Sequence, residues 1–142
     1  RYEALAKKLL GVIRSSVSSS SAPGQYIFLK ALDSQGYEEQ KKRYRAILQE
    51  RYRKARDFLA SATMPPCLRP LPFNSGYFMS FECVGISAEA LRVKLLDERS
   101  IGTVSMQDRY LRVAFSSVEA SHIEDLYAEI LKAATELAAA KK

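Results

Sequence analysis

The stretch Tyr110-Leu-Arg-Val-Ala-Phe115 is apolar apart from one arginine, and it predicts a β-strand around which the fold is built. Alternation along the strand places Leu111, Val113 and Phe115 on one face and Arg112 on the other. A guanidinium in an apolar strand is costly unless it meets an anion. Its planar donor fork matches a carboxylate. Two interpretations remain open, an internal salt bridge to an Asp or Glu and a bound carboxylate.

The sequence around this strand predicts further strands and helices. A turn at Gln107–Asp108 joins the strand to the one before it. The expected elements, in order, are a helix from Tyr37 to about Ala62, strands Leu68–Phe73 and Tyr77–Cys83, a helix Ala88–Glu98, strands Ile101–Met106 and Tyr110–Phe115, and a helix that starts near Ser121. This order, α-β-β-α-β-β-α, predicts an α+β fold with a small, mainly antiparallel sheet flanked by helices.

Two serines are expected to begin helices in this region. Ser87 is a good N-cap for the helix that follows it, and that helix should turn Leu91 and Leu95 inward. Ser121 and Glu124 have the spacing of a capping box, which predicts the start of the last helix.

The first 36 residues predict a helical segment that precedes this domain. Apolar residues recur at helical spacing from Arg1 to about Val17, and a second helix is expected over Gln25–Asp33. The serine-rich run 15–24 between them is either a flexible linker or an ordered turn whose hydroxyls and amides face an anion. Because the chain begins without Met inside an expected helix, we expect it to be a piece of a longer protein.

Composition restricts the class of protein. The chain has 142 residues, is 47% hydrophobic and 27% charged, and carries a net charge of +6. These values are typical of a globular domain and exclude intrinsic disorder, collagen-like repeats and a disulfide scaffold. The positive charge favours anionic partners. No apolar run is long enough for a membrane helix and no secretory leader opens the chain, so we expect a cytoplasmic protein with no membrane partner.

Few residues could support catalysis by this chain alone. His122 is the single histidine, so no cluster of histidines can bind a metal. Because we expect it in an exposed first turn of the last helix, we expect no Ser–His–Asp triad. Cys67 and Cys83 lack metal-type spacing and are expected to be reduced. No glycine-rich phosphate loop of the P-loop or dinucleotide type is present in the sequence.

The long helix from Tyr37 carries most of the positive charge. Its cations are Lys41, Lys42, Arg43, Arg45, Arg51, Arg53, Lys54 and Arg56. Acidic residues alternate with them at helix-pairing distances, which favours a solvated helix face. The alternative is a nucleic-acid interface in which Tyr44 and Tyr52 stack on bases.

Several segments together resemble a known family, the class I/II aminotransferases. Tyr110-Leu-Arg-Val-Ala-Phe115 followed by an amphipathic helix is similar to their Leu-Arg-Ile-Ser/Ala-Phe segment. Asn74-Ser-Gly-Tyr-Phe-Met-Ser-Phe81 resembles their small-domain strand pair. Ile13-Arg-Ser-Ser-Val-Ser-Ser18 through Pro23-Gly-Gln25 resembles the stretch that follows their cofactor lysine, and the arginine-rich helix resembles the one that joins their two domains. The likeness covers nearly the whole chain in the family's order.

The resemblance implies an enzyme of fold type I, usually a homodimer, that uses pyridoxal 5'-phosphate to transfer an amino group between an amino acid and a 2-keto acid. It implies that Arg112 binds the substrate α-carboxylate, that Arg14 reaches the neighbouring subunit's site to hold a side-chain carboxylate, and that Ser18 lies near the cofactor. Residues 1–36 would be the helical remnant of the large α/β cofactor domain and residues 37–142 would form the C-terminal small domain.

The sequence departs from the family's pattern in several places. The usual Asn-Pro-Pro is absent near Arg14, and Gly102-Thr-Val-Ser-Met-Gln-Asp108 replaces the Pro-Gly-x-x-Phe segment, which leaves the substrate preference open. The resemblance places the cofactor lysine before Arg1, so we expect no bound cofactor and no catalysis by this chain alone. The alternative function is a free-standing basic α+β module that binds nucleic acid or a protein partner.

Overall fold

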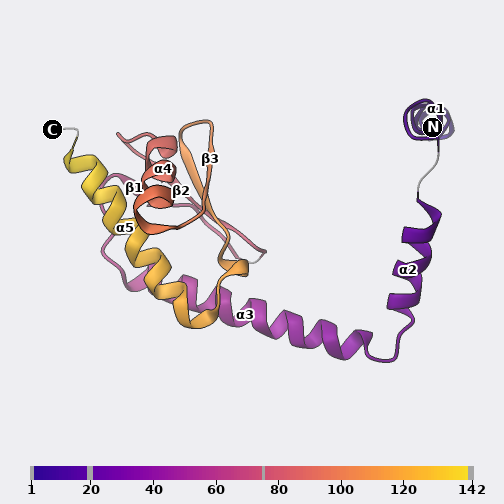
Figure 1. Ribbon diagram of the computed structural model, residues 1–142, viewed down its shortest axis with the longest axis horizontal. Coiled ribbons are helices and arrows are strands. Elements are labelled where there is room, and N and C mark those ends of the chain that lie inside the picture. Colours follow the sequence, from indigo (N-terminus) through magenta and orange to yellow (C-terminus); the bar gives the residue numbers. More distant parts are fainter. Residues whose placement is uncertain (1, 19–20, 75, 141–142) are drawn as a thin grey trace. The chain divides into compact units, whose positions relative to one another are not determined.

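The computed structural model describes residues 2–18, 21–74 and 76–140 (Figure 1). The chain forms two compact units, Arg1–Lys42 and Arg43–Lys142. The division falls within the long helix α3 (Tyr37–Ser61). The domain boundary expected after residue 36 stays a prediction.

The first unit contains the helices α1 (Glu3–Ser16) and α2 (Ala22–Leu32). The Ser21 hydroxyl accepts a hydrogen bond from the Gly24 amide at 3.4 Å and caps α2. Helical structure therefore extends further into the serine-rich run than the sequence predicts, and Ser19 and Ser20 lie outside the described residues.

No described residue of α1 or α2 is buried. The exposed apolar side chains of the two helices and the residues beside them are Tyr2, Leu5, Leu9, Leu10, Val12, Ile13, Val17, Tyr26, Ile27, Phe28 and Leu29. In the described part of this unit the amphipathic pattern yields helices but no core.

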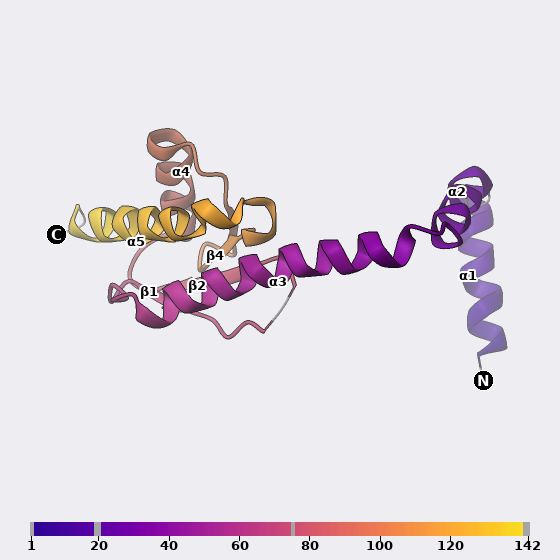
Figure 2. The same cartoon turned by 90° about the horizontal axis from the view of Figure 1, so that it is seen from below.

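The second unit is an α+β domain, as the sequence predicts (Figures 1 and 2). After α3 it contains β1 (Leu68–Pro70), β2 (Met79–Cys83), α4 (Ala88–Arg99), β3 (Val104–Met106), β4 (Tyr110–Val113), the short 3₁₀ helices η1 (Phe115–Ser117) and η2 (Ala120–His122), and α5 (Ile123–Ala139). The described strands form an antiparallel sheet in the order β1-β2-β4-β3.

Several predicted boundaries differ from the structure. β2 begins at Met79 rather than Tyr77, and β3 begins at Val104 rather than Ile101. β1 ends at Pro70, although the Leu71 amide still donates to the Ser80 carbonyl oxygen of β2 at 2.9 Å. β4 ends at Val113, because the chain turns into η1 and still buries Phe115. The predicted capping box of the last helix is wrong: η2 leads directly into α5, and His122 occupies the N-cap without a side-chain hydrogen bond.

One face of the sheet and the helices of the second unit enclose the core. The buried side chains from the strands are Leu68, Met79, Phe81, Cys83, Leu111 and Val113, and those from the helices include Ala55, Leu91, Leu95, Ile123, Tyr127 and Ile130. Among the described residues of α3, Ala55 alone is buried, although Phe58 and Leu59 pack against the core.

Both cysteines are free and buried. The Cys67 thiol lies 3.5 Å from the Ala134 carbonyl oxygen, and burial raises its pKa. Burial also raises the pKa of Cys83, to about 11. At neutral pH both side chains are therefore protonated and behave as small apolar residues.

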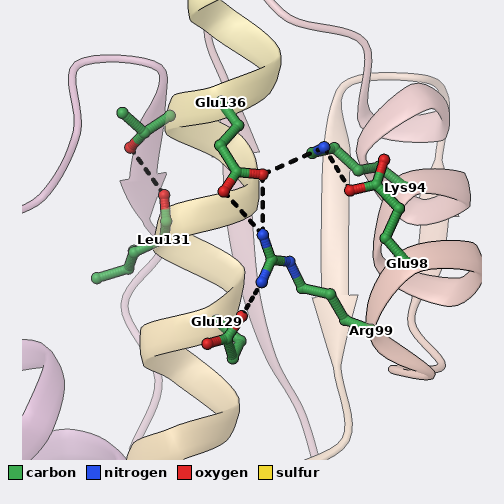
Figure 3. A network of polar contacts seen from close by, with 7 residues as sticks. Lys94, Glu98, Arg99, Glu129, Leu131 and Glu136 are labelled. Atoms are coloured by element: carbon green, nitrogen blue, oxygen red, sulfur yellow. Dashed lines mark hydrogen bonds and ion pairs between the residues drawn. The ribbon is translucent and has the colours of Figure 1, made fainter.

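Ion pairs connect α4 to α5 (Figure 3). Arg99 at the end of α4 contacts both carboxylate oxygens of Glu136 at 2.8 Å and also pairs with Glu129. Lys94 lies 3.2 Å from Glu136 and 2.6 Å from Glu98.

The start of α4 is as predicted, since the Ser87 hydroxyl accepts a hydrogen bond from the Ala90 amide at 2.9 Å.

Candidate functional site

Arg112 lies on the outer face of β4, opposite the core. β4 is paired on both sides, with Ser80 of β2 and Val104 of β3 opposite Arg112. Its neighbours Leu111 and Val113 are buried. The alternation predicted from the sequence is confirmed, and it leaves Arg112 half-buried on the face that the core does not use.

No carboxylate of the described residues pairs with Arg112. Its guanidinium carbon instead lies over the Phe78 ring, 4.7 Å from the ring centroid. The Nε atom is buried and has no hydrogen-bond partner among the described residues. The internal salt bridge, one of the two interpretations of the sequence, is therefore not formed in this part of the chain.

The acidic residue nearest in the ladder, Glu82, is already paired. It lies on the same outer face and accepts from Arg69 at 3.1 Å and from Arg109 at 2.6 Å. The hydrogen bond from Arg109 is the main cause that lowers the pKa of Glu82. Glu82 is therefore charged at neutral pH and balances these two guanidinium groups rather than that of Arg112.

Phe78 is a site residue to which the sequence analysis gave no role. Its side chain is 46% exposed, and Val104, opposite Arg112, is 44% exposed. The signal was present in the sequence: if Met79 points into the core, alternation turns Phe78 and Ser80 to the face that carries Arg112. The arginine thus lies beside exposed apolar surface.

A cavity of about 400 Å³ lies between α3 and the segment that leads into β2. It is lined by Arg45, Leu48, Gln49, Tyr52, Asn74, Gly76 and Tyr77. The carbonyl oxygen of Ser116 in η1 accepts from Arg51 on α3, and the Tyr52 ring packs against Phe73 with centroids 5.4 Å apart. These contacts fix the middle of α3 against the sheet.

The described ion pairs support the interpretation of α3 as a solvated helix. Lys41 pairs with Glu38 at 3.2 Å, and Arg56 pairs with Asp57 at 2.8 Å. Both pairs join exposed side chains within the helix, and Lys41 and Glu38 have the i,i+3 spacing of neighbours on one helix face. These ion pairs do not gather the cations of α3 into one binding site.

Arg14 and Ser18 lie in the first unit, whereas Arg112 lies in the second. Arg14 is exposed in the last turn of α1. Ser18 follows that helix in a left-handed conformation, with φ at 64°.

His122 is exposed at the start of α5. Among the described residues, no three His, Cys, Asp or Glu side chains cluster as a metal site would require.

No helix in the described part of the chain combines the length and apolar character needed to cross a bilayer.

No protein-family model matches the sequence, and no curated protein matches it. Solved structures do match. The α-aminoadipate aminotransferase LysN from Thermus thermophilus, complexed with N-(5'-phosphopyridoxyl)-L-leucine, superposes with a TM-score of 0.78 at 22% identity, over 98% of this chain and 37% of that one.

A kynurenine aminotransferase from Pyrococcus horikoshii superposes with a TM-score of 0.77 at 15% identity, over 94% of this chain and 35% of that one. The chain has the fold of part of an aminotransferase. It spans little more than a third of either structure. The resemblance inferred from the sequence is thus confirmed at the level of the fold.

Proposed function

We propose that this chain is part of a pyridoxal-phosphate-dependent aminotransferase and that Arg112 binds the α-carboxylate of the amino acid or keto acid substrate. The observation that carries the proposal is a half-buried guanidinium with no carboxylate partner among the described residues, on the open face of a paired strand. The fold shared with two aminotransferases supports the reaction class.

The proposed role follows from the shape of the side chain. A guanidinium donates two parallel hydrogen bonds to one carboxylate and so fixes its plane as well as its position. Fixing that plane also orients the Cα–H bond of the substrate for proton transfer. Strand β4 supplies the rigidity, because it is paired on both sides and anchored in the core by Leu111 and Val113.

Pyridoxal phosphate, when bound, supplies the electron sink that makes the Cα proton of an amino acid acidic. No lysine of the described residues is buried, and Lys94, which is half-buried, is paired with Glu98 and Glu136. The described lysines therefore do not fit the group that would hold this cofactor. We assign substrate binding to this chain and propose that catalysis requires further residues.

Replacing Arg112 tests the proposal in the protein that carries this chain, loaded with the cofactor. We expect Arg112→Met to lower kcat/KM for amino acids by about a hundredfold or more, because charge-assisted, desolvated hydrogen bonds contribute about 2–5 kcal/mol. Arg112→Lys should recover only part of this loss, since it keeps the charge but not the fork. The measurement is the single-turnover rate against amino acid concentration.

Arg69→Met is the matched control, because Arg69 lies on the same face but pairs with Glu82. It should change kcat/KM less than about twofold. Wild-type kinetics in Arg112→Met would remove Arg112 from the site and contradict the proposal.

Arg14 and Ser18 have proposed roles in a homodimer, Arg14 toward a substrate side-chain carboxylate in the neighbouring subunit and Ser18 beside the cofactor. The support is the sequence resemblance together with the exposure of Arg14, which has no ion pair among the described residues. In the same assay, Arg14→Met should lower kcat/KM for dicarboxylic amino acids and leave monocarboxylic ones unchanged. An equal effect on both would contradict this role.

A further inference from the structure

We propose that Phe78 is a positioning residue for Arg112: its ring holds the guanidinium on the open face of the sheet while leaving the Nη donors available for a substrate carboxylate. This inference rests on the proposed function of Arg112. The contact that suggests it is the 4.7 Å distance between the guanidinium carbon of Arg112 and the centroid of the Phe78 ring.

The backbone on both sides fixes the position of the ring. Met79, the next residue, is buried and pairs with Val113 in the ladder. Tyr77, the preceding residue, accepts a hydrogen bond from the Ser116 amide at 3.3 Å through its carbonyl oxygen. Because Met79 points into the core, Phe78 projects to the face that carries Arg112.

An aromatic ring holds a cation in a different way from a carboxylate. The ring attracts the guanidinium through its negative face and provides no specific acceptor atom. The Nη–H groups lie in the guanidinium plane and remain able to bind a planar anion. The positive charge also stays uncompensated, so it still attracts a carboxylate.

A second arginine in the same sheet provides the comparison. Arg109 also lies over a ring, that of Tyr110, at 5.4 Å from the centroid. Its donors, however, are occupied by Glu82, which accepts from Nε at 3.1 Å and from Nη2 at 2.6 Å. Arg109 therefore takes part in a structural ion pair with Glu82. Arg112 contacts the Phe78 ring but pairs with no carboxylate of the described residues.

The Nε atom of Arg112 indicates that the ring restrains this side chain. It is buried and lacks an acceptor among the described residues, and a buried unpaired donor is costly. A side chain free to move would turn this donor toward water. Without the ring we therefore expect the guanidinium to swing into solvent and to lose the geometry for a bidentate contact.

Phe78→Leu removes the ring and keeps an apolar side chain, while Phe78→Tyr keeps the ring. In the cofactor-loaded protein we expect Phe78→Leu to raise KM for amino acids about two- to fivefold, the factor that an exposed cation–π contact provides, with kcat changed less. Phe78→Tyr should retain the wild-type KM. Tyr110→Leu is the matched control and should leave KM unchanged, because Glu82 still holds Arg109.

A binding measurement on the full chain is independent of catalysis. The probe is 4-methylpentanoate, a monocarboxylate without an amino group. The observable is the Arg112 Nε–Hε cross-peak in NMR spectra. In the wild type we expect this peak to be shifted by the ring current of Phe78 and to move further on titration with the probe. In Phe78→Leu the ring-current shift should vanish and the apparent affinity should fall about two- to fivefold.

The outcomes separate this inference from the proposed function. If Arg112→Met has wild-type kinetics, both the function and the inference fail. If Arg112→Met loses activity but Phe78→Leu matches the wild type in KM and in probe binding, only the role of Phe78 is wrong. Absence of a ring-current shift in the wild type would overturn the contact itself, even if Phe78→Leu did not fold.

Discussion

Helices α1 and α5 are both amphipathic, yet they differ completely in burial. α5 has Ile123, Tyr127 and Ile130 in the core, and two alanines beside them. α1 has no described buried residue, and its Leu5 and Leu9 are exposed. The comparison shows that an apolar stripe marks the side of a helix that can be covered, whereas only tertiary contacts show what covers it.

The largest expected difference between the two helices is in amide hydrogen exchange of the full chain. α1 has 14 residues, too few to be stable as a helix in water without packing. We expect its amides to exchange with little protection, while those of α5 are protected roughly a thousandfold or more by the folded core. Mass spectrometry at low protein concentration measures both. Equal protection of α1 and α5 would show that a partner surface covers α1.

A pair of phenylalanine substitutions is expected to have the next largest effect. Phe81 in β2 is 0% exposed and packs edge-on against Tyr127 at 6.2 Å, whereas Phe28 in α2 is 64% exposed. Phe81→Ala should lower the free energy of unfolding by about 3–5 kcal/mol, because it leaves a cavity.

Phe28→Ala removes the same atoms from the surface and should change stability by less than about 0.5 kcal/mol. Urea unfolding followed by circular dichroism measures both variants. A large loss in Phe28→Ala would mean that α2 is packed in solution.

The smallest expected effect concerns the ion pairs between α4 and α5. Arg99 and then Lys94 hold the pKa of Glu136 below its usual range. A carboxylate with a lowered pKa stabilises the fold fully above its unfolded pKa, about 4.3, and loses that contribution as the pH falls through its lowered folded pKa. Glu136→Gln should therefore lower Tm at pH 7, and its difference from the wild type should shrink below about pH 4.

Arg99→Met tests the same pH dependence of Tm by removing the cation instead of the carboxylate. It removes the main cause of the lowered pKa, so it should also make Tm less dependent on pH in the acid range. Thermal unfolding between pH 7 and pH 3 measures both variants. An unchanged acid slope in both would show that these pairs do not contribute.

The local features of the fold could be predicted from the sequence because they depend on neighbouring residues. Alternation placed Arg112 opposite Leu111 and Val113, and the serine at 87 identified the start of α4. The α+β class followed from the order of the elements. The capping box at Ser121 was wrong because Ser121 lies inside the 3₁₀ helix η2, and His122 rather than Ser121 occupies the N-cap of α5.

The candidate site was only partly predictable. The sequence singled out Arg112 but left both a salt bridge and a bound carboxylate open, since strand alternation does not show which acids lie within reach. Glu82 could have been a partner, and only the structure shows that Arg69 and Arg109 occupy it. Phe78 was missed because its role comes from a contact with a residue far along the chain.

The sequence by itself determined the helices, the strands and the face of β4 to which Arg112 belongs, because propensity, capping and alternation act over a few residues. The tertiary structure decided which partners those faces have. It paired Arg99 with Glu129 and Glu136, placed Phe78 beside Arg112 and left the apolar side chains of α1 exposed. These outcomes depend on contacts between segments separated by tens of residues, and no local pattern encodes the distances on which charge pairing and ring contacts depend.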